Sequence, residues 1–161
     1  MKLSVSSILL LLIVNTSCSN RIVYCGQNKT DPVVIRKNPE KAYFEYVKQH
    51  TNDIKLSLKY LNILDIGGVS ANTKSEITTL REKLNQQNIF VQEVLKSSFF
   101  AFSQNPCNKE VVTNHLNILQ KFSESNKTVK DVTTTLEKLT NSVNFSNDIE
   151  STLNNLNKKL K

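Results

Sequence analysis

Residues 74–104 have the sequence KSEITTLREKLNQQNIFVQEVLKSSFFAFSQ, and this stretch decides the fold that we expect. Apolar residues recur in it at spacings of three and four, which places them on one face of an amphipathic α-helix. The second half is apolar on more than one side, because Phe90, Val94 and Phe99 lie outside that stripe. We therefore predict a central helix whose second half lies between neighbouring elements. Its stripe consists of Ile77, Leu80, Leu84, Val91, Leu95, Ser98 and Phe102.

The segment before this helix carries a second amphipathic pattern with clear ends. Asn38 and Pro39 are typical of a helix start, because Asn caps well and Pro suits the first helical position. Two glycines favour an end near Asp65, and the short loop 69–73 then leads to an antiparallel second helix. The stripe of this first helix is Tyr43, Val47, His50, Ile54, Leu58, Leu61 and Leu64.

A third helix is predicted to open after Asn105 and Pro106, which repeat the same start signal. Its apolar spacing runs without a slip to Val143, and a continuous helix from Pro106 to Val143 would project as a coiled-coil arm. The polar run at 125–127 predicts instead a turn followed by a separate fourth helix. We favour the turn, because a compact bundle buries more of the same stripe.

The last segment restarts the pattern out of phase, six residues after Val143 where seven would continue it. This shift predicts a bend or loop at 144–147. No proline follows Pro106, and the whole chain has only three Gly, which favours helix throughout. The fold class is therefore all-α: an up-and-down bundle of three to four long helices over residues 38–161, with a candidate coiled coil at its end. The restarted stripe is Ile149, Leu153, Leu156 and Leu160.

Residues 1–19 have the composition of an export signal, with one Lys, an apolar run and then small polar residues. The run is too short to span a bilayer, which takes about 20 apolar residues. The end of this leader resembles a bacterial lipoprotein signal, since small residues precede Cys18 and Ser19 follows it, although Asn15 stands where an aliphatic residue is usual. The resemblance implies a lipid on Cys18. The alternative is an ordinary cleavage after Ser19.

Cysteine usage agrees with export. Three cysteines leave one unpaired, and lipidation or removal of Cys18 leaves Cys25 and Cys107 as one disulfide in an oxidising compartment. Such a distant pair without a CxxC spacing is typical of a structural bridge. Residues 20–37 contain Pro, Gly and Asn, and we expect an extended linker or arm there, tied down at Cys25.

The formal net charge is +7, spread along the chain rather than gathered in one block. This pattern, together with export, argues against a nucleic-acid partner. One local feature is a basic ridge on the first helix that could touch an anionic surface or an acidic partner, although a solvated helix face is the commoner explanation. The ridge consists of Lys41, Lys48, Lys55 and Lys59.

The sequence offers no recognisable set of catalytic or metal-binding residues. His50 and His115 lie on the apolar stripes of different helices, where satisfied buried histidines are the usual outcome, and no zinc, phosphate-binding or nucleophile-elbow motif is present. Acid clusters lie among lysines on faces that we expect to be solvated. We predict no catalytic residue, no metal, no cofactor and no small-molecule substrate. The acid clusters are Glu45 with Asp53, Glu76 with Glu82, and Asp148 with Glu150.

The leading hypothesis is a non-enzymatic exported helical protein, anchored as a lipoprotein to a bacterial envelope, that binds an unidentified protein or envelope component. The alternative is a soluble secreted, effector-like protein whose C-terminal heptads pair with a host or self helix. A third hypothesis, an enzyme assembled from scattered polar residues, would require a deep pocket that holds His50 or His115 beside a perturbed carboxylate.

Overall fold

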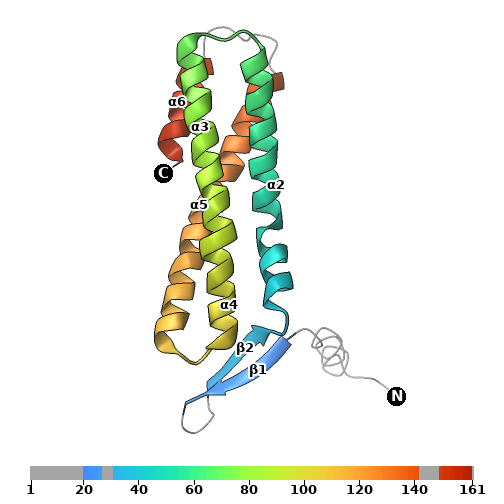
Figure 1. Cartoon of the computed structure of the whole chain (residues 1–161), viewed down its shortest axis with the longest axis vertical. Coiled ribbons are helices and arrows are strands. Elements are labelled where there is room, and N and C mark those ends of the chain that lie inside the picture. Colours follow the sequence, from blue (N-terminus) through green and yellow to red (C-terminus); the bar gives the residue numbers. More distant parts are fainter. Residues whose placement is uncertain (1–19, 27–30, 142–148, 161) are drawn as a thin grey trace, which may run out of the picture.

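The computed structural model describes residues 20–26, 31–141 and 149–160. These residues form a mostly helical structure with a small two-stranded sheet (Figure 1). The leader 1–19, with Cys18, and the predicted bend 144–147 lie outside the described residues. The elements are β1 (Asn20–Cys25), β2 (Asp31–Arg36), α2 (Pro39–Ile66), α3 (Ala71–Ile89), the π-helical segment η2 (Phe90–Leu95), α4 (Lys96–Gln104), α5 (Lys109–Asn141) and α6 (Ile149–Lys159).

Helix α2 begins and ends where its sequence signals predict. The Asn38 side chain accepts a hydrogen bond from the backbone N–H of Lys41 over 2.9 Å, and Pro39 occupies the first turn. At the other end the Gly67 N–H donates to the Leu64 carbonyl, and Gly68 has a φ of 73°, which a glycine adopts without strain. Both predicted ends of the first helix are therefore confirmed.

The predicted central helix is present, but it contains one π-helical turn. Helix α3 starts at Ala71, because the Ser70 side chain caps it, so the predicted loop 69–73 is shorter than expected. In η2 the N–H of Lys96 reaches the carbonyl of Val91, five residues back. As the predicted stripe requires, Val91 and Leu95 are fully buried and Val94, outside the stripe, is 44% exposed. The π turn accommodates one extra residue and so keeps the apolar stripe facing inward.

Helix α5 is continuous, so the favoured turn at 125–127 is wrong. Its middle is held by polar partners on neighbouring helices: the Ser125 hydroxyl donates to Gln87 over 2.5 Å, and Asn126 contacts His50. These contacts give hydrogen-bond partners to polar side chains whose sequence pattern predicts a loop. The helix does not project as an arm either, because it packs along α2. The Asn108 side chain caps its start.

Residues 20–25 and 31–36 are extended, as expected for an arm, but they are paired as the two strands of a β-hairpin rather than lying free. The strands are antiparallel, with Asn20 opposite Arg36 and Cys25 opposite Asp31. The hairpin lies at the end of the molecule where α2 begins and α4 meets α5 (Figure 1). Ile35, 3% exposed, is its buried contact with the helices. The sequence pattern missed the strand pairing, which depends on contacts at this end.

The helices pack around two apolar clusters that follow one another along the molecule. One cluster joins α2, α3, α5 and α6; the other joins α2, η2 and α5 near the hairpin. Helix α6 lies alongside α3 in the half away from the hairpin (Figure 1). Lys83 fixes its end, since the ammonium donates to the carbonyls of Asn157 and, over 2.7 Å, of Leu160. The second cluster consists of Tyr43, Val47, Val91, Leu95 and Phe122.

Candidate functional site

The hairpin is joined covalently to the helices. The Sγ atoms of Cys25 and Cys107 are 1.93 Å apart, and the Cα atoms are 5.3 Å apart. Cys107 lies between α4 and α5, so the bond fixes the end of β1 to the loop that joins those helices. The Arg21 guanidinium adds a hydrogen bond of 3.3 Å to the Ser103 carbonyl oxygen. The two cysteines that sequence analysis pairs therefore lie at bonding distance.

Cys18, the predicted lipid attachment residue, lies outside the described residues. β1 begins at Asn20, so one residue, Ser19, separates this cysteine from the start of the described chain. Residues 20–25 and 31–36 pair as strands, so they do not form a free tether between an anchor and the helices.

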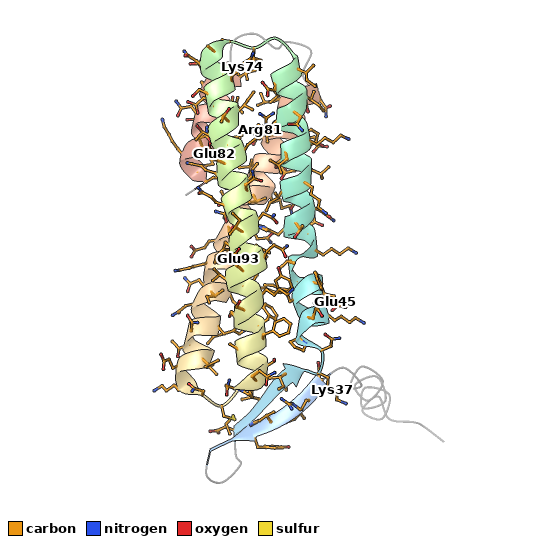
Figure 2. All side chains as sticks on the ribbon, viewed as in Figure 1. Lys37, Glu45, Lys74, Arg81, Glu82 and Glu93 are labelled. Carbon is orange, nitrogen blue, oxygen red and sulfur yellow. A yellow bond between two sulfur atoms is a disulfide. The ribbon has the colours of Figure 1, made fainter. Side chains whose placement is uncertain are left out.

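The four lysines of the predicted ridge are all exposed on α2. In the described part of the chain the ion pairs are Arg81 with Asp65, at 2.9 Å, and Lys96 with Glu40, at 3.9 Å, and neither involves the ridge. Glu45, which Figure 2 shows on the outer side of α2, interrupts the ridge with a negative charge. The ridge is thus available for contact but is not uniformly basic. Its members are Lys41, Lys48, Lys55 and Lys59.

A layer of buried polar side chains lies between α2 and α5. Ser57 and Thr133 share a hydrogen bond of 2.8 Å between their hydroxyl groups, and Thr133 also donates to the Asp53 carbonyl over 3.1 Å. Asp53 is only 5% exposed, so its predicted place on a solvated face is wrong. Its Oδ1 accepts from Gln49 over 2.8 Å. Among the described residues, Asp53 Oδ2 and His50 Nε2 are buried without a hydrogen-bond partner.

His50 itself is 1% exposed, and its Nδ1 lies 3.3 Å from Asn126 Oδ1. Burial lowers the pKa of this histidine, while the Asn126 hydrogen bond and the nearby Asp53 carboxylate act in the opposite direction. The ring also packs edge-on against Phe122, with centroids 5.0 Å apart. The imidazole is therefore enclosed in the interior, where a substrate has no direct route to it.

His115 has a different set of partners. Its Nδ1 lies 2.6 Å from the Ser98 hydroxyl oxygen, and its ring stacks on Phe102 with centroids 4.7 Å apart. Burial lowers its pKa. Ser98 and His115 resemble two members of a catalytic triad in type only, because both are buried and no described carboxylate is hydrogen-bonded to His115. Residues 20–26, 31–141 and 149–160 contain no cluster of three or more metal-ligand side chains.

Two cavities are relevant to the enzyme hypothesis. The larger, about 460 Å³, opens where α6 ends, and the smaller, about 100 Å³, lies between the hairpin and the helices. His115 lines the smaller cavity, but the acids Asp53 and Glu45 line neither. The deep pocket with a histidine beside a carboxylate, which the enzyme hypothesis requires, is thus not provided by these two cavities. The larger is lined by Gln87, Phe90, Lys121, Glu124, Ser125, Thr128, Lys159 and Leu160.

Sequence reasoning missed most of the buried polar layer, although one signal was available. Ser57 occupies the core position three residues after Ile54 and four before Leu61, where sequence analysis had used Leu58 instead. A serine at such a position indicates a polar partner on the facing helix. That partner, Thr133, sits in a run of threonines with no pattern that singles it out.

A scan against protein-family models and searches of curated proteins and of solved structures found no match to this chain. Among the described helices, none combines the length and the apolar character that crossing a bilayer takes. The function must therefore be argued from the geometry and chemistry of the chain itself.

Proposed function

We propose that this chain is an exported, non-enzymatic up-and-down helical bundle, anchored by a lipid on Cys18 to a bacterial envelope, that binds another protein or envelope component. The observation that carries the proposal is the Cys25–Cys107 bond, with sulfur atoms 1.93 Å apart. Disulfides persist in oxidising compartments outside the cytosol. The bond uses two of the three cysteines and leaves Cys18, in the leader, for another role.

The bundle architecture is supported by how the helices bury their stripes. Leu80 and Leu84 of α3, Val132 of α5 and Leu153 of α6 are all fully buried in one cluster. The chain direction alternates from α2 to α3, from α4 to α5 and from α5 to α6 (Figure 1). A bundle of this kind presents long, rigid helix faces, which suit recognition of another macromolecule.

A binding role is favoured over catalysis because the reactive groups are enclosed. His50, Asp53 and Ser98 are each at most 5% exposed. His50 and Ser98 are paired with Asn126 and His115 of α5, which links helices, and Asp53 accepts a hydrogen bond from Gln49 within α2. General acid–base catalysis needs a group within reach of a substrate.

The soluble, effector-like alternative depends on free C-terminal heptads. Val129, Val132 and Leu136 of α5 are fully buried within the chain, which leaves that stripe little area for pairing with another helix. Mass spectrometry of the mature N-terminus separates the two proposals. A diacylglyceryl mass on Cys18 is expected, whereas a free N-terminus at Asn20 would reject the anchor.

The ridge on α2 is the surface through which we expect a partner to bind. The test compares two sets of four Lys→Gln changes in pulldowns with the mature chain. Changing the ridge should remove a captured partner, because each exposed charge contributes modestly and four act together. Changing four exposed lysines of α5 should leave capture intact. If both variants lose capture of the partner equally, the ridge contributes only through the overall positive charge of the protein and is not a specific binding surface. The sets are Lys41, Lys48, Lys55 and Lys59, and Lys121, Lys127, Lys130 and Lys138.

A further inference from the structure

The hairpin has one face buried and one face exposed and apolar. In the antiparallel register Ile22 lies opposite Val34, and Tyr24 lies opposite Pro32, so these four residues share one face of the ribbon. Ile22 is 56% exposed, Tyr24 55% and Val34 59%. The other face carries Cys25 and Ile35 toward the helices. Clustered exposed apolar residues in a structure with well-filled cores indicate a contact surface.

This outer face lies beside the point where the chain enters the described structure. β1 starts at Asn20, two residues after Cys18, and two residues of any chain span at most about 7 Å. A lipid attached there brings the hairpin to the headgroup region before any other element. The hairpin occupies one end of the long helical structure (Figure 1), so the approach is not blocked by a helix.

The charges nearest this face are suited to an anionic surface. Lys37 follows β2 directly, is exposed, and extends at the hairpin end of the molecule in Figure 2. Arg21 is exposed too, but it lies opposite Ile35 on the other face and donates to the Ser103 carbonyl, so Lys37 is the cation that we assign to the contact. Two acids are close: Asp31 at the far end of β2, and Glu40, whose carboxylate lies 3.9 Å from the Lys96 ammonium. A lysine near an anionic bilayer is attracted to the negative surface potential of the lipid headgroups.

We propose that the outer face of the β-hairpin is a membrane-contact surface that lies in the headgroup region of an anionic bilayer. Ile22 and Val34 enter the interface, Tyr24 sits with its ring in the apolar boundary and its hydroxyl in water, and Lys37 meets the phosphates. This inference deepens the proposed function, and it rests on the export and on the position of Cys18 described there. Contact of the hairpin with the bilayer would fix the orientation of the helices relative to the membrane that holds the lipid anchor.

The test uses the chain from residue 20 to 161, which has no Cys18. The residues of both core clusters and the disulfide lie between residues 25 and 160, so this chain retains the described fold, and circular dichroism checks that it does. Binding of this chain to vesicles tests the hairpin surface alone. The mass of the mature N-terminus tests the anchor, so failure of one is distinguishable from failure of the other.

The protein contains no tryptophan, so a single substitution gives a clean fluorescent reporter. Tyr24→Trp places it on the proposed surface, and Leu116→Trp places the control on α5, where Leu116 is 58% exposed. With vesicles of phosphatidylcholine and phosphatidylglycerol, the emission of the Tyr24→Trp chain should shift to the blue and be quenched by brominated acyl chains. Leu116→Trp should show neither effect. An unchanged emission at position 24, or equal effects at both positions, overturns the proposal.

Binding itself is measured by vesicle flotation. Replacing Ile22, Tyr24 and Val34 together by Ser should lower the partition coefficient by about tenfold or more, since apolar area leaves the interface. Lys37→Gln should lower it on vesicles that contain phosphatidylglycerol and not on pure phosphatidylcholine. The control Leu116→Ser should stay within about twofold of the parent chain. If the parent chain does not bind, or if it self-associates in sedimentation and the three Ser changes abolish that, the surface is not a bilayer contact.

Discussion

The Nδ1 atom of His50 on α2 lies 3.3 Å from Oδ1 of Asn126 on α5, in the part of α5 where the sequence favours a turn. The contact links two residues 76 positions apart. It gives Asn126 a partner at a position where an asparagine would otherwise favour a loop. The helix therefore runs on, and its two halves face two different apolar clusters.

The continuity of α5 can be tested with proline. Lys127 is exposed, so Lys127→Pro removes no core contact, but it breaks the backbone hydrogen bond of a continuous helix and should cost about 3 kcal/mol of unfolding free energy. Lys109→Pro is the control, because the first helical position needs no N–H donor. Urea unfolding gives both values. If the two variants have equal unfolding free energies, a turn at 125–127 interrupts the helix and α5 is not continuous.

If the π turn holds one extra residue, deleting a single residue from it should be tolerated better than deleting one from a regular helix. Removing Glu93 from η2 should let the helix close as regular α-helix with Leu95 and Phe99 still facing inward, at a cost within about 1 kcal/mol. Removing Glu82 from α3 rotates the flanking residues by about 100° relative to each other and should cost several times more. Both side chains are exposed and appear on the outer side in Figure 2. Thermal melting compares them, and similar losses would contradict this role of the π turn.

The disulfide should stabilise the hairpin more than the helices. Reduction, or Cys107→Ser together with Cys25→Ser, opens a loop with a sequence separation of 82 and should cost about 4 kcal/mol. Far-ultraviolet circular dichroism should keep most of its helical signal, because the helices have their own cores. Hydrogen exchange should rise first in residues 20–36. Retained protection there under reducing conditions would show that the hairpin docks without the bond.

Acid should destabilise the fold through its two buried histidines. Burial lowers the pKa of His50 and His115 below the usual 6.5. The unfolded chain therefore binds protons at a higher pH than the folded chain, and stability is lost as the pH falls below about 6.5. Each histidine contributes a limiting slope of about 1.4 kcal/mol per pH unit. Urea midpoints measured between pH 8 and 5 should show a smaller slope in His50→Gln than in the parent chain.

The main helices were predictable because their signals are local. The cap at Asn38, the glycines after Ile66 and the stripe from Ile77 onward depend on residues a few positions apart. The candidate site was less predictable. The pairing of Cys25 with Cys107 followed from the number of cysteines, because lipidation or removal of Cys18 leaves only these two. The exposed hairpin face depends on the pairing of Ile22 with Val34, which no local pattern specified.

Local patterns and residue counts were enough to predict a mostly helical chain, the two ends of its first helix and the pairing of Cys25 with Cys107. These features depend on propensity, capping and composition, which are local or compositional properties. Three features became apparent in three dimensions alone: α5 continues through its polar middle, Asp53 is buried, and residues 20–25 pair with residues 31–36. These outcomes depend on partners far apart in the chain, such as Asn126 for His50 and Thr133 for Ser57. The free energy of a buried polar group is set by the partner that folding brings to it.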